Sequence, residues 1–144
     1  MFQKKIDVRW ADVDQNRHVR HSAYYDYGAH ARMSFFAEKG FKPKSMLQLG
    51  IGPILFKEEC TFIKELKLGE TVTVNLLKGD MLPDGSRWSL HHEIFNTKGE
   101  KSAHITIKGA WIDLKLRKLA IPPKELVEVM INLDQGEAYE YGKS

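Results

Sequence analysis

Hydrophobic and polar residues alternate near the start of the chain, where Ile6, Val8 and Trp10 are separated by charged side chains. A period of two is typical of a strand that buries one face, so residues 6–10 are predicted to form a half-buried strand. The pattern stops at the polar stretch 15–17. A loop is therefore expected between this strand and the next element.

The next periodic segment is helical and runs from about Ser22 to Lys39. Its apolar and aromatic residues fall close to helical spacing, at Tyr24, Tyr27, Ala31 and Phe35. Ser22 is the predicted N-cap, and Gly40 stands where a helix C-terminus is expected to be capped. Small residues from Gly28 onward would permit a close approach to a surrounding sheet.

From residue 54 onward the pattern changes to strands separated by turns. Extended segments are expected at 54–66, 71–77, 88–94 and 103–116, with turns at 83–85 and 96–99 and a bulge at Gly109. Short helices are predicted at 44–50 and, after two prolines, at 124–133. One strand, one long helix, about four antiparallel strands and a terminal helix predict an α+β domain.

The length of 144 residues suits a single domain, 1–144, of which residues 135–144 are predicted to be a flexible tail. No apolar run approaches the roughly 20 residues of a membrane span. A single cysteine, Cys60, excludes an internal disulfide framework and fits a reducing compartment, so a cytoplasmic protein is expected. The net charge of +3 is mild, and no block of lysine and arginine indicates nucleic-acid binding.

Titratable side chains crowd into residues 9–25, directly after the first strand. Asp12 and Asp14 stand at the strand exit, and His18 and His21 precede the helix. A carboxylate can activate water or attack a carbonyl carbon, and the first amides of a helix lack internal partners and can stabilise an oxyanion. The same side chains occur in metal sites, but their spacing here is not distinctive, and no metal is expected.

This stretch is part of a larger set of motifs that occur in order along the chain. They are Asp12-Val13-Asp14, Val19, His21, Tyr24 and Arg32, then Leu68-Gly69-Glu70, Gly85-Ser86, Ile94-Phe95-Asn96, Asp113 and Ile121-Pro122. In these motifs the chain, from Ile6 to about Val129, resembles the hot-dog-fold acyl-CoA thioesterases of the 4-hydroxybenzoyl-CoA thioesterase type. The similarity is strongest to the branch associated with bacterial envelope gene clusters.

The resemblance implies a hot-dog fold, in which an antiparallel sheet wraps around a long central helix. It implies a homodimer or a dimer of dimers, with the active sites at the dimer interface. The substrate would be an acyl-coenzyme A thioester, hydrolysed to a free acid and CoA. No cofactor would be needed, because coenzyme A is part of the substrate.

The resemblance also assigns catalytic roles. Asp14 matches the catalytic carboxylate, acting as nucleophile or general base, and Asp12 matches an acid that binds loop amides or an arginine. His21 matches a functional histidine of one branch, and a polar residue at a helix start is the equal alternative. The backbone amides of His21 and Ser22 would polarise the thioester carbonyl.

Further residues are assigned to binding. His18, in a mainly structural role, and Tyr24, largely a core residue, would border the substrate pocket. Lys57 and Arg87 would meet the phosphates of CoA, since cations suit such groups, and solvated surface charge is the alternative for both. Arg17 stands where relatives commonly have glycine, which leaves the loop conformation open.

Two other functions stay open on the sequence. A hot-dog hydratase or dehydratase would pair a histidine with an acid, and the Asp-x-Asp motif at a strand end argues against it. A non-catalytic acyl-thioester-binding module would keep the fold without turnover, because a fold does not fix a function. His92, in phase with Trp88 and Ile94, is predicted to be a hydrogen-bonded histidine in the core or an interface.

Overall fold

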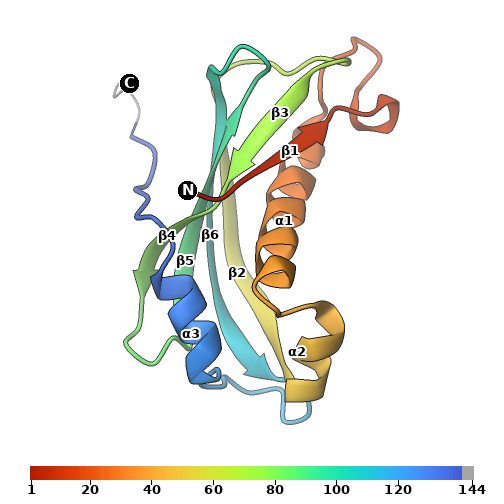
Figure 1. The fold of residues 1–144 in the computed structure, drawn as a ribbon. Helices are drawn as coiled ribbons and strands as arrows, with labels where there is room; N and C mark the ends of the chain where they lie inside the picture. The colour runs from red at the N-terminus through yellow and green to blue at the C-terminus, as the bar shows by residue number, and fades with distance from the viewer. Residues whose placement is uncertain (141–144) are drawn as a thin grey trace.

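A computed structural model describes residues 1–140 of the protein (Figure 1). Its elements are β1 (Gln3–Asp7), a 3-10 turn (Trp10–Asp12), α1 (His21–Glu38), α2 (Pro43–Leu49), β2 (Ile51–Phe62), β3 (Thr71–Asn75), β4 (Leu77–Met81), β5 (Arg87–Phe95), β6 (Lys101–Asp113) and α3 (Lys124–Ile131). This order of strands and helices is that of an α+β protein, as the sequence predicted.

The strands form one antiparallel sheet in the order β1-β3-β5-β6-β2, and β4 also pairs with β5. Strands β1 and β2 are therefore the two ends of the main sheet. Figure 1 shows α1 running along one face of the curved sheet, with α2 at its end next to β2. This arrangement leaves one long edge, that of β2, next to the helices.

Helix α1 buries one face against the sheet, formed by Ala23, Tyr24, Tyr27, Gly28, Ala31 and Phe35. The spacing of most of these residues predicted the helix. The sheet lies close to the helix at Gly28, where an added Cβ would lie 3.1 Å from His92 Cδ2 and 3.3 Å from Ile105 Cδ1. The long helix is thus the central element, and a small residue permits its close packing on the sheet.

The first strand ends earlier than its alternation predicted. β1 stops at Asp7, and Trp10 lies in the 3-10 turn with 83% of its surface exposed. The cause is Asp12, whose carboxylate accepts hydrogen bonds from the Arg9 amide at 3.0 Å and the Arg9 guanidinium at 2.9 Å. These bonds fold residues 9–12 into a compact turn in place of extended backbone.

The caps of α1 match the sequence only at the C-terminus. Gly40, with a φ of +93°, follows the helix end, and its N–H donates to Ala37 O at 3.1 Å. Ser22 is not the N-cap: Arg20 occupies that position, and the hydroxyl of Ser22 accepts a hydrogen bond from the Arg20 guanidinium. The helix therefore begins without a side-chain cap on its first amides.

The segment predicted as one strand at 71–77 forms two strands, β3 and β4, that separate after Asn75. The side chain of Asn75 accepts from the Glu93 N–H at 2.6 Å and donates to Glu93 Oε1 at 2.8 Å. Its carbonyl oxygen lies 2.7 Å from His92 Nδ1. Because these groups take the place of regular ladder bonds, the pairing with β5 is interrupted after Val74 and resumes at Leu77.

The bulge expected at Gly109 lies instead on the neighbouring strand, β2, opposite Gly109. The register of β2 on β6 skips Phe56, between the pairs Leu55–Gly109 and Lys57–Lys108. A Cβ on Gly109 would lie 2.5 Å from the Ile54 carbonyl oxygen. Glycine is therefore needed for the close approach of the bulged strand.

Residues 135–140, part of the predicted flexible tail, contact the sheet. Gln135 pairs in parallel with Lys78 of β4, and the Gly136 N–H donates to Lys78 O at 2.8 Å. The ring of Tyr139 lies 6.0 Å from that of His104. Residues 141–144 of the predicted tail lie outside the described structure.

His92 is a hydrogen-bonded core histidine, as predicted. Its Nδ1 faces the carbonyl oxygen of Asn75, which only accepts, so Nδ1 carries the proton and Nε2 accepts from Arg32 Nη1 at 2.9 Å. Burial, reinforced by the Arg32 charge, lowers the pKa of His92 to about 3. Burial, followed by the charge of Lys101, lowers the pKa of His104 to about 4.

These two histidines predict acid sensitivity. A histidine in the unfolded chain titrates near pH 6.5, so below that value the unfolded state binds more protons than the folded state. The free energy of unfolding should then fall as the pH drops from about 6.5 toward 4, by up to about 1.4 kcal/mol per unit for each histidine. Urea unfolding across this range measures it, and His104→Gln should reduce the slope. An unchanged slope in the variant would contradict the assignment.

Candidate active site

The loop between β1 and α1 is held in one conformation by backbone hydrogen bonds. Val13 pairs with Val19, the Asp14 N–H donates to His18 O at 2.9 Å, and the Arg17 N–H donates to Asp14 O at 3.0 Å. Arg17 has a φ of +64°, in the left-handed region that favours glycine. The loop thus keeps the conformation that a glycine would allow, with arginine in that position.

Asp14 presents its carboxylate at the exposed side of this loop. Oδ1 accepts from the Asn16 N–H at 2.8 Å and the His18 N–H at 3.3 Å. Oδ2 makes no hydrogen bond to any residue among 1–140. One oxygen is therefore oriented by the loop, and the other is free to face a ligand.

Asp12, two residues earlier, has the opposite environment. It is buried, bonds Arg9 and accepts from the Tyr27 hydroxyl at 3.0 Å. Burial alone would raise the pKa of Asp12, but the hydrogen bonds from Arg9 and Tyr27 outweigh it and lower the pKa. All of its contacts hold the turn and the helix in place, which agrees with the structural role predicted for the first acid.

The start of α1 provides two amides without acceptors. The Ala23 N–H is used, donating to Arg20 O at 3.0 Å. The N–H groups of His21 and Ser22 have no acceptor within the described part of the chain. Since the helix dipole adds partial positive charge here, these amides can bind a partial negative charge.

Loop and helix start open into one surface cleft with a volume of about 830 Å³. It is lined by Asp14, Asn16, His18, Val19, Arg20, His21, Ser22, Tyr24, Phe62, Ile63, Lys64 and Glu65. The rings of His21 and Tyr24 pack on Phe62, with centroids 4.6 Å and 4.9 Å away. His18 Nε2 lies 3.2 Å from Glu65 Oε2. The structure thus brings together Asp14, His18, His21, Ser22 and Tyr24.

Lys57 and Arg87 do not line this cleft. They border a shallower groove on the sheet, together with Phe56 and Lys108. The Arg87 guanidinium lies 5.4 Å from the centroid of the Phe56 ring, and Lys57 Nζ pairs with Glu59 Oε1 at 2.6 Å. A contact of either cation with CoA phosphates stays a prediction.

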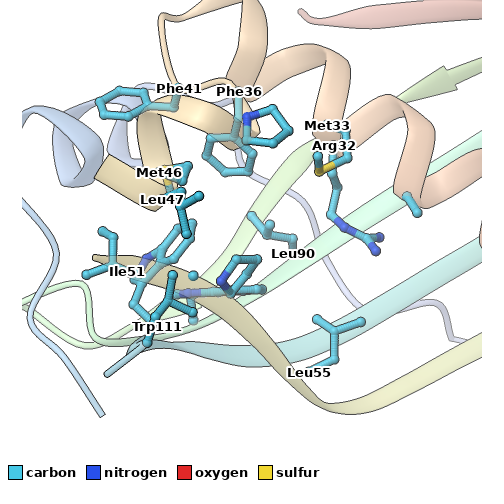
Figure 2. A pocket seen from close by; sticks show the side chains of 16 residues that line it. Arg32, Met33, Phe36, Phe41, Met46, Leu47, Ile51, Leu55, Leu90 and Trp111 are labelled. Carbon is cyan, nitrogen blue, oxygen red and sulfur yellow. The ribbon is translucent and has the colours of Figure 1, made fainter. Parts of the chain in front are cut away.

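The sequence did not indicate a second, apolar cavity of about 490 Å³ between α1, α2 and β2 (Figure 2). Its lining includes Met33, Phe36, Phe41, Met46, Leu47, Ile51, Leu55, Leu90 and Trp111. Arg32 is the one charged residue among its lining residues. Burial lowers the pKa of Arg32, and Glu58, 4.0 Å away, opposes that effect. Because its lining residues come from several helices and strands, no single sequence motif indicated the cavity.

Known proteins resemble the chain in sequence and structure. A family model described as the Thioesterase-like superfamily matches residues 8–130. YneP of Bacillus subtilis (strain 168), named as a candidate acyl-CoA thioesterase, is 27% identical over 111 residues, or 77% of this chain and 79% of that protein.

Two solved structures have the same fold. A hypothetical protein from Staphylococcus aureus in complex with CoA has a TM-score of 0.87 at 18% identity, covering 99% of this chain and 92% of that one. A 1,4-dihydroxy-2-naphthoyl-CoA thioesterase from Synechocystis has a TM-score of 0.82 at 20% identity, and the match covers 94% of this chain and 98% of that one. At these identities the likeness concerns the fold.

The chain belongs to the thioesterase-like superfamily, whose model spans most of its length. The prediction of a hot-dog-fold acyl-CoA thioesterase is thereby confirmed at the level of fold and enzyme class. Within residues 1–140, no helix is long and apolar enough to cross a membrane.

Proposed function

We propose that the protein hydrolyses acyl-CoA thioesters in the cleft at the start of α1, with Asp14 as the catalytic carboxylate. The observation that carries the proposal is a carboxylate with one free oxygen in the same cleft as two amides without acceptors. The thioester carbonyl oxygen would accept from the amides of His21 and Ser22. Asp14 would then attack the carbonyl carbon or remove a proton from the attacking water.

His21 has a supporting part in this proposal. It is exposed, its ring packs on Phe62, and it lines the cleft. In that position its imidazole can donate a hydrogen bond to the thioester or to the leaving thiolate. Tyr24 is buried and supports the same aromatic wall, which agrees with a role in shaping the pocket.

The edge of β2 supports a homodimer. β2 is 12 residues long, pairs only with β6 among the described strands, and exposes Leu55, Phe56 and Phe62. Long apolar strand edges are normally covered, and antiparallel pairing of two copies about a twofold axis covers this one. The proposed dimer therefore joins two sheets through β2.

This pairing would complete the active site. Phe62, at one end of β2, lines the catalytic cleft, and Leu55, toward the other end, lines the apolar cavity. In an antiparallel pair, the cleft end of one strand lies beside the cavity end of its partner. The acyl group bound in one cleft would then extend into the cavity of the other subunit.

Mixing two inactive variants tests this arrangement. Asp14→Asn removes the carboxylate and keeps the cavity, whereas Met33→Trp fills the cavity from a half-exposed position and keeps the carboxylate. Each homodimer should hydrolyse acyl-CoA poorly. Random mixed dimers should regain about a quarter of the parental activity, since half the dimers are mixed and each has one intact site.

Light scattering and a thiol-release assay over short, long and aromatic acyl-CoAs provide the readouts. The expected mass is that of a dimer or a dimer of dimers. An active monomer, or mixtures no more active than either variant alone, would contradict a site shared between subunits while leaving Asp14 as the carboxylate.

A further inference from the structure

One end of the molecule combines exposed apolar side chains with positive charge. It consists of residues 42–50, around α2, and residues 114–121, which follow β6, and is called the basic tip below. Figure 1 shows the two segments together at the lower end of the fold, and the Leu114 N–H donates to Gly50 O at 2.9 Å. Leu47, Leu116 and Ile121 are 69%, 65% and 70% exposed.

The charges of the basic tip have one sign. Its cations are Lys42, Lys44, Lys115, Arg117 and Lys118, and neither segment contains an aspartate or glutamate. All five are exposed, and none forms an ion pair with a residue in 1–140. The cations are therefore available to an external anion.

The part of the tip after β6 is a defined turn. The Asp113 carboxylate accepts from the N–H groups of Lys115 and Leu116, at 2.9 Å and 2.8 Å. The chain then returns along β6, where Ile112 pairs with Leu119. Arg117 adopts a φ of +59° at the turn. Leu116 is consequently held outward between basic neighbours.

This combination points to one kind of partner. A second copy of the same tip would bring like charges together, and a coenzyme phosphate would leave the leucines in water. A bilayer with anionic headgroups satisfies both features, because cations bind the headgroups while exposed apolar side chains enter the interface. We propose that the basic tip docks the protein on anionic lipid surfaces.

Docking would also orient the apolar cavity. Leu47 and Leu114 belong to both the tip and the cavity lining. A docked molecule would therefore hold this cavity next to the acyl region of the lipid. For this consequence alone, the inference rests on the proposed function, in which the cavity receives the acyl chain of the substrate.

Vesicle flotation of the full-length protein tests the docking. Binding is expected to vesicles of phosphatidylcholine with phosphatidylglycerol, to fall as salt rises, and to be weak with phosphatidylcholine alone. Each basic side chain at an anionic surface contributes roughly fivefold in partitioning, so Lys115→Glu/Lys118→Glu should weaken binding by about 25-fold or more. Leu116→Ser/Ile121→Ser should weaken it without changing the charge.

The matched control is Lys5→Glu/Lys98→Glu, which makes the same charge change at exposed sites outside the basic tip. The control should bind nearly as the parent does, and all variants should keep their melting temperature and their turnover of a short, water-soluble acyl-CoA. Equal binding by the two charge variants, or equal binding to neutral and anionic vesicles, would overturn the proposal.

Two further outcomes would assign the tip to another partner and also overturn the proposal. Unchanged vesicle binding by Leu116→Ser/Ile121→Ser, together with a changed mass in light scattering, would mark a contact between copies. Unchanged vesicle binding by Lys115→Glu/Lys118→Glu, together with a raised KM for acyl-CoA, would mark a coenzyme contact. If the unmodified protein hydrolyses no acyl-CoA, that result would count against the proposed function, and the vesicle-binding result would still stand.

Discussion

Replacing Asp14 with asparagine is expected to lower the rate of thioester hydrolysis by about 10²–10⁴, the usual cost of losing a positioned general base. The asparagine oxygen can still accept from the N–H groups of Asn16 and His18, which Asp14 Oδ1 holds at 2.8 Å and 3.3 Å. The loop should therefore keep its conformation. Single-turnover hydrolysis of the best acyl-CoA by the folded variant measures the effect on chemistry alone.

Two neighbouring variants serve as comparisons. Asp12→Asn should reduce stability more than rate, because Asp12 is buried and holds Arg9 and Tyr27. His21→Ala should lose an intermediate amount of activity, since its ring borders the cleft while its backbone amide remains. If Asp14→Asn hydrolyses the substrate within about threefold of the parent, well short of the range for a lost base, Asp14 is not the catalytic carboxylate.

Replacing Gly28 with leucine is expected to destabilise the fold by about 1–3 kcal/mol, the typical cost of overpacking a core. The new Cβ alone would lie 3.1 Å from His92 Cδ2, and the remaining side chain has to displace that ring. His92 is fixed by Asn75 and Arg32, so moving it also breaks a buried hydrogen-bond network. Thermal and urea unfolding both measure the loss.

A matched change on the same helix separates packing from helix propensity. His30 is exposed on α1, so His30→Leu adds a similar side chain without meeting the sheet. It should unfold close to the parent, and Gly28→Ala should lie between the two leucine variants. A Gly28→Leu protein that melts like the parent would mean that α1 does not pack against β5 and β6 as described.

The sequence predicted the central helix and placed several residues of the candidate cleft together because both are local. The helix follows from the spacing of residues such as Tyr24, Tyr27 and Phe35, and the same residues are buried on α1. The cleft residues Asp14 to Tyr24 lie within one short segment, so their proximity follows from chain connectivity. The assignment of Asp14 over Asp12 came from the family resemblance, and the burial of Asp12 agrees with it.

Three features that the sequence did not predict depend on contacts between distant segments. The break after Asn75 arises from its hydrogen bonds to Glu93 on β5, and the bulge at Phe56 depends on the pairing of β2 with β6. The apolar cavity takes its lining from helices and strands far apart in the chain. Alternation and helical spacing contain no information on such pairings.

The covering of β4 has a consequence for aggregation. On one side β4 pairs with β5. On the other, the Lys78 N–H donates to Asp134 O at 2.9 Å and the Gly136 N–H donates to Lys78 O at 2.8 Å. A protein shortened before Asp134 would keep all of its strands but leave these backbone groups bare. An uncovered strand edge is a template for pairing with other molecules, so these few residues protect the edge of β4 from pairing with another chain.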